Sequence, residues 1–276
     1  MYNNHIMSLD QFYTKEDIAA NYYVQLQTIV NVGDFDVILE PSAGKGSFFK
    51  LLPHSKRKGI DVEPKCPDIE QMDYFNFNPE QNKKYLVIGN PPFGRISSIA
   101  VKFFNKSATF ADCIAFIIPR TFKRVSIQNK LSLDFKLVHS EDLPMEPCCF
   151  EPKMSAKCCF QIWTRASPQR QKVIYDKTHE DFTFLKHGSK DANNQPTPPL
   201  GADFVMKAYG SNCGEIVEQE LQKLRPKSWH WIKSNIDANL LKERFNTLDY
   251  SMSKDTVRQD SIGRQEVIYL YKMKYN

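Results

Sequence analysis

Four short strand candidates, most of them apolar, constrain the fold of this chain more than any other feature. Segments with turn residues or helical spacing separate them, so consecutive strands have room to run parallel. A parallel sheet is covered by helices on both faces, and its strands are therefore apolar throughout. The sequence predicts an α/β fold built on a mostly parallel sheet flanked by helices. The candidates are Val37–Leu39, Lys58–Val62, Tyr85–Gly89 and Cys113–Ile118.

Other segments extend this pattern along the chain. Two later strands are predicted at Phe135–His139 and Cys158–Trp163, the second as an antiparallel closing strand. Four segments have the apolar spacing of helices. These are Ile18–Val30, Ser47–Leu52, Ser97–Ser107 and Ile236–Phe245.

The character of the chain changes after Thr164. The segment Lys186–Leu200 lacks apolar periodicity and contains three prolines, so we expect an exposed loop there. Beyond it, short strand-like runs resume. We predict two domains, residues 1–165 and a smaller C-terminal α/β appendage of residues 166–276. The alternative is that the second part only extends the core of the first.

Composition excludes several classes of protein. With 41% hydrophobic and 25% charged residues over 276 positions, the chain is neither disordered nor collagen-like. It has no run of 18 apolar residues, which predicts no membrane span, and its first residues lack the apolar core of a secretory signal. Seven cysteines, an odd number, favour a reducing, intracellular compartment. The net charge of +5 is compatible with nucleic acid without indicating it.

A glycine turn at residues 40–46 follows the first strand candidate. Gly44 and Gly46 allow a sharp backbone turn and the close approach of a ligand. The turn is not a Walker loop, because that loop needs Ser or Thr directly after Gly-Lys, whereas Lys45 is followed by glycine. Glu40, just before the glycines, disfavours a pyrophosphate and suits a cationic ligand. Taken alone, such a turn is more often structural than ligand-binding.

Two acids stand where the next strands are expected to end. Asp61 follows the glycine turn at the sequence spacing typical of an acidic residue that binds a ribose. A carboxylate there can accept hydrogen bonds from both ribose hydroxyls. The alternative is a surface carboxylate beside Lys65. Asp73 precedes the aromatic pair Tyr74-Phe75, so it could accept from an adenine amino group while a neighbouring ring stacks on the base.

The most specific motif is Asn90-Pro91-Pro92-Phe93, directly after the strand candidate Tyr85–Gly89. The two prolines fix the backbone and remove two N–H donors. What remains is a rigid pair of acceptors, the side-chain oxygen of Asn90 and the carbonyl of Pro91, beside an aromatic face. Such a pair suits a planar exocyclic amine. The alternative is a Pro-Pro turn between a strand and a helix.

Together these motifs resemble those of class I S-adenosylmethionine-dependent amino-methyltransferases, in particular the N6-adenine branch. The resemblance covers roughly residues 8–165 and rests on EPSAGKGSF, Asp61 and NPPF, preceded by Phe-Tyr-Thr. It implies a Rossmann-like sheet and S-adenosylmethionine as cofactor. The motif order resembles the gamma arrangement, in which target recognition lies C-terminal. Lys45 departs from the pattern, and Phe93 favours a nucleobase over the glutamine substrate of a related branch that carries Tyr there.

The resemblance implies a role for each matching residue. Phe12 and Thr14 would close the cofactor pocket, and Asn90, Pro91, Pro92 and Phe93 would form the catalytic motif. The implied cofactor-binding residues are Phe12, Thr14, Glu40, Pro41, Ala43, Gly44, Gly46, Asp61, Asp73, Tyr74 and Asn90.

Substrate contacts are predicted on two further segments. Arg120, Lys123 and Arg124 follow the fourth strand and could hold phosphates. Phe93 is expected to stack on the target base and Phe150 to supply a second stacking ring, with a core role as the alternative for Phe150. No metal site is predicted, because the paired cysteines lack the spacing of zinc ligands.

The sequence therefore predicts methyl transfer from S-adenosylmethionine to the N6 amine of adenine in nucleic acid. DNA is slightly preferred because of the motif order. The alternatives are an RNA N6-adenine methyltransferase, an inactive nucleic-acid-binding scaffold and a protein glutamine methyltransferase. Nucleic acid is the expected partner, no membrane is expected, and the sequence predicts neither a protein partner nor the recognition sequence.

Overall fold

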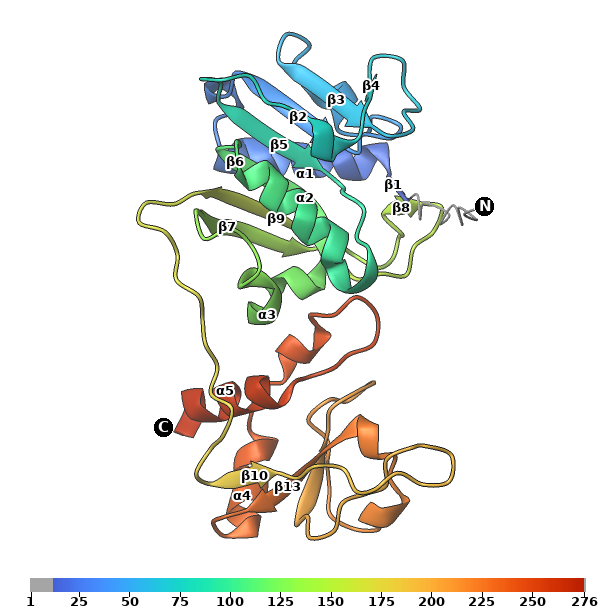
Figure 1. The fold of residues 1–276 in the computed structure, drawn as a ribbon, viewed down its shortest axis with the longest axis vertical. Helices are drawn as coiled ribbons and strands as arrows, with labels where there is room; N and C mark the ends of the chain where they lie inside the picture. The colour runs from blue at the N-terminus through green and yellow to red at the C-terminus, as the bar shows by residue number, and fades with distance from the viewer. Residues whose placement is uncertain (1–11, 276) are drawn as a thin grey trace, which may run out of the picture. The chain divides into compact units, whose positions relative to one another are not determined.

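The computed structural model describes residues 12–275, which fall into two compact units divided between Lys172 and Val173 (Figure 1). Unit 1 precedes this division and unit 2 follows it. The boundary predicted near residue 165 falls at the last residue of strand β9 (Cys158–Arg165). Each unit has its own sheet and its own apolar core.

Unit 1 is built on a seven-stranded sheet in the order β4-β3-β2-β5-β6-β9-β7. The first five strands in this order run parallel, and β9 is antiparallel to both of its neighbours. The predicted Rossmann-like, mostly parallel α/β fold is confirmed. Strand β9 is antiparallel as predicted, but it does not close the sheet, because it lies between β6 and the edge strand β7. Besides β9, the strands are β4 (Glu70–Gln71), β3 (Arg57–Asp61), β2 (Val37–Pro41), β5 (Tyr85–Gly89), β6 (Cys113–Pro119) and β7 (Phe135–Asp142).

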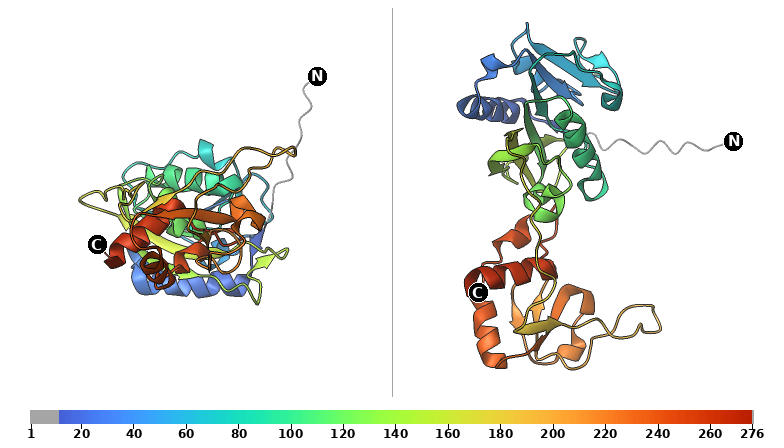
Figure 2. Two further views of the ribbon diagram at one scale, coloured as in Figure 1. Left: turned by 90° about the horizontal axis from the view of Figure 1, so that it is seen from below. Right: turned by 60° about the vertical axis from the view of Figure 1, so that its left-hand side comes forward.

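Helices cover both faces of this sheet, which explains why its central strands are apolar throughout. Helix α1 (Glu16–Ile29) lies on one face of the sheet and helix α2 (Ser98–Ala108) on the other, as Figure 1 and the right-hand view of Figure 2 show. Helix α2 places Phe103 and Phe104 against alternate residues of the central strands. The opposite set of strand residues faces α1, whose Tyr22 ring lies 4.7 Å from that of Phe160.

The smaller elements of unit 1 include one correction. The predicted helix at Ser47–Leu52 is only a 3-10 turn, η2 (Phe49–Leu51), because the short connection from β2 to β3 is largely used by the glycine turn. A separate two-stranded sheet pairs β1 with β8. The remaining elements are β1 (Tyr13–Thr14), β8 (Phe150–Glu151), α3 (Val125–Gln128), η1 (Val32–Asp34), η3 (Tyr74–Asn76), η4 (Arg95–Ser97) and η5 (Arg120–Lys123).

Unit 2 is a four-stranded antiparallel sheet in the order β10-β13-β11-β12, with a core shared by its two helices. The predicted helix Ile236–Phe245 is present as α4, and residues 186–200 form the expected loop. Strand β10 and helix α5 were not predicted. The elements are β10 (Phe182–Phe184), β11 (Phe204–Lys207), β12 (Ile216–Val217), β13 (Trp229–Ser234), α4 (Ala238–Asn246), α5 (Arg264–Tyr275), η6 (Leu221–Lys223), η7 (Pro226–Ser228) and η8 (Ser251–Lys254).

Two features are absent from residues 12–275. None of the helices in this part of the chain combines the length and the apolar character that a bilayer crossing requires. Within the same residues, no three side chains of His, Cys, Asp or Glu are grouped so that they could hold a metal ion.

Candidate functional site

Parallel strands bring the predicted residues to one edge of the sheet in unit 1. Strand β2 ends in Glu40 and Pro41, β3 ends in Asp61, and Asn90 directly follows β5. These three strands are neighbours in the sheet, and parallel strands end at the same edge. We call this place, defined by Glu40, Asp61 and Asn90, the carboxyl edge.

The glycine turn fits closely beneath an aromatic ring. Gly44 has a φ of +51° and Gly46 a φ of +78°, a region that favours glycine. A Cβ on Gly44 would lie 2.7 Å from Cε1 of Tyr13, so the Tyr13 ring packs directly on the turn. Ala43 donates its backbone N–H to the carbonyl of Ile60 at 2.9 Å. Backbone conformation and packing therefore require these glycines, whatever ligand the turn holds.

Asp61 stabilises the glycine turn through its carboxylate. One oxygen accepts the N–H of Gly44 at 2.8 Å, and the other accepts the N–H of Glu63 at 2.7 Å. Each carboxylate oxygen has two acceptor sites, so capacity remains for hydroxyl donors of a ligand. Asp61 can thus shape the turn and bind a ligand at the same time.

Glu40 is buried, with 3% of its surface exposed. Its Oε2 accepts the N–H of Phe49 at 2.6 Å, and a Cβ on Gly89 would approach its Cγ to 3.2 Å. Burial raises the pKa of this carboxyl to about 8, although the backbone hydrogen bonds from Phe49 and Phe48 act in the opposite direction. Burial therefore favours the protonated form of Glu40, whose side chain packs against Gly89 of β5 and bonds to turn η2.

The side chain of Asn90 has one partner and lacks another. Its Nδ2 donates to the backbone carbonyl of Phe12 at 3.1 Å. Its Oδ1 is buried and has no hydrogen-bond partner among residues 12–275. Buried acceptors are nearly always paired, so this oxygen has the capacity to accept from a ligand or from water, as has the Oε1 of Gln25, which is likewise buried without a partner among the described residues. Of the next residues, Pro91 is buried, whereas Pro92 and Phe93 are partly exposed.

The β1–β8 pair lies over the glycine turn. Lys45 connects the two strands, because its Nζ lies 4.9 Å from the ring centre of Tyr13 and 3.8 Å from the carboxylate of Glu151. The carbonyl of Thr14 accepts the hydroxyl of Ser47 at 2.6 Å. The Thr14 hydroxyl oxygen is buried and has no partner within the described part of the chain. The edge therefore has a second unpaired polar atom.

The two residues predicted around position 73 have different environments. Asp73 is exposed and begins turn η3, where its Oδ1 accepts the N–H of Phe75 at 2.9 Å. Tyr74 is not placed as expected, because its ring is 2% exposed and its hydroxyl bonds to Ser107 at 2.7 Å within the core. It cannot stack on a ligand. Phe75, 42% exposed, is the neighbouring ring that could.

Several side chains that were predicted to contact the substrate interact with other residues of the chain. Arg120 and Lys123 both face Asp142, at 3.4 and 3.1 Å, so this single carboxylate offsets one of their two positive charges. Arg124 begins helix α3. Phe150 is 4% exposed in strand β8, which favours the core role for this ring over base stacking.

A strained loop follows the Asn-Pro-Pro-Phe motif. Gly94, Ile96 and Ser97 all have positive φ, of +66°, +53° and +58°. For residues other than glycine, such backbone conformations cost about 1–3 kcal/mol each and are concentrated at functional sites. Ser97 is fully buried and its hydroxyl bonds to that of Thr121 at 2.7 Å, whereas Ile96 is 72% exposed.

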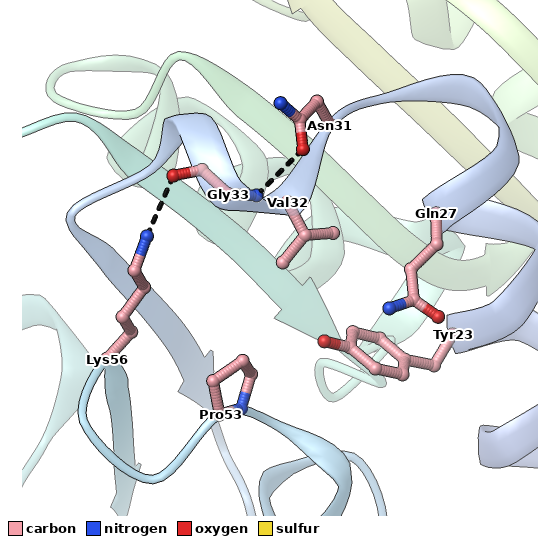
Figure 3. A pocket seen from close by; sticks show the side chains of 7 residues that line it. All are labelled: Tyr23, Gln27, Asn31, Val32, Gly33, Pro53 and Lys56. Carbon is pink, nitrogen blue, oxygen red and sulfur yellow. Dashed lines mark hydrogen bonds between the residues drawn. The ribbon is translucent and has the colours of Figure 1, made fainter.

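A cavity of about 350 Å³ lies at the opposite edge of the sheet, where β2 and β3 begin (Figure 3). Lys56 donates to the carbonyls of Gly33 and Phe35 at 2.8 Å each, and Asn31 accepts the N–H of Gly33 at 3.1 Å. We call this place the amino edge. The lining residues are Tyr23, Gln27, Asn31, Val32, Gly33, Pro53 and Lys56.

Sequence reasoning missed three residues of the carboxyl edge. Tyr13 was predicted only as part of a segment. Side chains alternate along a strand, so if Phe12 and Thr14 face one side, Tyr13 faces the other. This alternation could have indicated a separate contact for Tyr13. The position of Lys45 against Glu151 joins segments far apart in the sequence. The strained Ile96 had no sequence signal, because a left-handed isoleucine is not predictable from residue type.

Comparisons with known proteins give only distant matches. No family model and no curated protein matches the chain. Solved structures match part of it. A protein of Pyrococcus horikoshii described as a candidate RNA methyltransferase has 18% identity and a TM-score of 0.43, covering 57% of this chain and 88% of that one.

Two other matches are similar in extent. The 23S rRNA methyltransferase ErmE has 14% identity and a TM-score of 0.40, covering 58% of this chain and 72% of its own. A dimethyladenosine transferase of Plasmodium falciparum has 16% identity and a TM-score of 0.40, and the match covers 57% of this chain and 64% of that one. The fold of unit 1 is established by its strand order and directions, and not by these distant likenesses.

Proposed function

We propose that the chain transfers a methyl group from S-adenosylmethionine to the N6 amine of adenine in nucleic acid. The observation that carries the proposal is the buried, unpaired Oδ1 of Asn90, which follows strand β5 and stands before two prolines. DNA is the preferred substrate on the order of the motifs, and RNA is the alternative that the experiment below separates.

The residues of the carboxyl edge fit the cofactor. The Asp61 carboxylate accepts the N–H of Gly44 and keeps acceptor capacity for two ribose hydroxyls. Asp73 is exposed and could accept from the adenine amine, with Phe75 beside it. The Thr14 hydroxyl offers a further hydrogen bond. When bound, the cofactor supplies a methyl group on a positively charged sulfur.

The chain contributes position and electrostatics. The lone pair of the adenine amine is delocalised into the ring, which makes the amine a poor nucleophile. Asn90 Oδ1 and the Pro91 carbonyl would each accept one of its hydrogens and draw them out of the ring plane. The lone pair would then form a bond to the methyl carbon as the carbon–sulfur bond breaks, with S-adenosylhomocysteine leaving and the amine releasing one proton to water. Proximity is worth up to about 7–11 kcal/mol in favourable cases. Phe93, partly exposed, would stack on the base at about 1–3 kcal/mol.

The test is a labelling experiment that does not assume the polymer. The full chain is incubated with S-adenosylmethionine carrying a tritiated methyl group and with random-sequence DNA, random-sequence RNA and a mixture of denatured proteins. Nucleoside mass spectrometry then locates the methyl group. We expect label in nucleic acid and N6-methyladenine as product. Label only in protein glutamine would support the alternative methyltransferase, and calorimetric absence of cofactor binding would support the inactive scaffold.

A further inference from the structure

The loop Gly94–Ser97 is held rigidly at both ends. On one side, the carbonyl of Phe93 accepts the N–H groups of Ile99 at 3.1 Å and Ala100 at 3.3 Å. On the other side, Ser97 is fully buried and bonds to a hydroxyl on turn η5. A loop anchored in this way presents its central residues in one fixed position.

The central residue, Ile96, exposes a large apolar side chain. It is 72% exposed, with φ +53° and ψ +40°, a conformation that β-branched residues rarely adopt. Ile99 packs where Gly94 has no side chain, so it supports the loop from within. Core packing does not require an isoleucine at such a position, because its side chain points away from the fold.

Next to it, Arg95 is exposed, and its guanidinium forms neither an ion pair nor a hydrogen bond with any residue from 12 to 275, although its backbone carbonyl accepts the N–H of Ser98. It differs in this from Arg120 and Lys123, whose charges face Asp142. An apolar side chain beside a free guanidinium matches the chemistry of an opened base stack, which has an apolar interior and a phosphate backbone outside it.

We propose that Ile96 is a wedge that enters the base stack of a double-stranded substrate, at the place that the reacting adenine leaves, while Arg95 contacts a neighbouring phosphate. The inference rests on the proposed function and specifies its substrate as a base-paired region. An enzyme that acts on a base in a duplex must first take it out of the stack. Asn90 and Phe93 would hold the extracted base, and Ile96 would fill part of the gap. A single strand offers no gap to fill.

The experiment compares methylation of the same random-sequence library as a single strand and as a duplex made by primer extension, for DNA and for RNA. The variant Ile96→Asn removes the apolar surface but keeps a residue that tolerates the left-handed backbone. Ile96→Leu keeps the apolar surface. We expect the ratio of duplex to single-strand methylation to fall at least tenfold in Ile96→Asn and less than threefold in Ile96→Leu.

Val24→Asn is the matched control, because Val24 is a 59% exposed β-branched residue on helix α1. Its ratio should equal that of the wild type. An equal loss on both substrates in Ile96→Asn would overturn the wedge, since it would mean that Ile96 shapes the site or contacts another part of the chain. A wild type that methylates only single strands would overturn it too, and the proposed function would stand. A wild type that methylates neither library would overturn both.

Discussion

At the amino edge of the unit 1 sheet, none of the residues that line the cavity of about 350 Å³ has a buried side-chain nitrogen or oxygen without a partner among residues 12–275, and Lys56 and Asn31 are hydrogen-bonded. At the carboxyl edge, Asn90 Oδ1 and Thr14 Oγ1 are buried and lack partners among residues 12–275. The two edges belong to the same sheet and differ in how completely their hydrogen bonds are satisfied.

In our proposal, unsatisfied hydrogen-bonding capacity at the carboxyl edge, and not the volume of the cavity at the amino edge, marks the ligand site. A ligand gains little binding free energy from hydrogen bonds in a cavity whose polar groups are already paired. A buried acceptor without a donor costs about 1–3 kcal/mol, which a ligand that supplies the donor recovers. Matched substitutions at the two edges can therefore break or sharpen the distinction.

The largest effect is expected for Asn90→Ala. Removing a positioned acceptor for the reacting amine should lower kcat by about 10²–10³-fold, as for other preorganised hydrogen bonds at reacting groups. Cofactor affinity, measured by calorimetry, should change no more than a few fold. Lys56→Ala at the amino edge is the control and should keep its rate within about twofold. Equal losses in both variants would remove the distinction between the edges.

The next largest effect is expected for Asp61→Ala. Its carboxylate accepts two backbone N–H groups and, in the proposal, ribose hydroxyls, so the dissociation constant for S-adenosylmethionine should rise at least tenfold, or about 1.4 kcal/mol. Asp36 at the amino edge accepts the N–H of Lys84 at 2.8 Å, which makes Asp36→Ala a matched control without an expected effect on affinity. An unchanged constant in Asp61→Ala would contradict the ribose assignment.

Glu40 predicts a pH dependence of stability. Because burial raises its pKa from the usual 4.5 to about 8, the folded state binds the proton more tightly than the unfolded state. This contribution to the free energy of unfolding is fully present below pH 4.5 and is lost as the pH rises to about 8. Urea unfolding across this interval should show the fall in the wild type and a flatter profile in Glu40→Gln. The same profile in both would mean that Glu40 is ionised throughout.

The smallest effect is expected for Lys45→Ala. The ion pair with Glu151 is largely exposed, at 52% and 63% of the two side chains, so its loss should cost at most about 1 kcal/mol in thermal unfolding. Cofactor affinity should fall less than about fivefold, because Tyr13 still packs on Gly44. A loss as large as that of Asp61→Ala would show that the strand pair β1–β8 controls binding.

Much of the fold could be predicted because its signals are local. The strands β2, β5 and β6 are short apolar runs. The place of β9 inside the sheet, between β6 and β7, was not predicted, because strand pairing depends on tertiary contacts. Helix α5 escaped prediction because tertiary packing decides it: Tyr271 is buried against unit 2 residues that come much earlier in the chain.

The candidate site could be predicted as a set of residues but not as a set of environments. Motif spacing placed Asp61 and Asn90 at one edge, since parallel strands end together. It could not show that Tyr74 points into the core, or that Asp142, on a distant strand, faces Arg120. Such contacts depend on which side chains folding brings together, and sequence spacing does not contain that information.

The central claim is that Asn90 Oδ1 accepts a hydrogen from the reacting amine, and binding to substrate analogues tests it most directly. With S-adenosylhomocysteine present, the wild type and Asn90→Ala are titrated with an oligonucleotide that the labelling experiment identifies, carrying either adenine or purine at the target position. We predict that the wild type prefers adenine about tenfold and that this preference falls at least about threefold in Asn90→Ala, where only the Pro91 carbonyl remains to accept from the amine. The same preference in both proteins would contradict the claim.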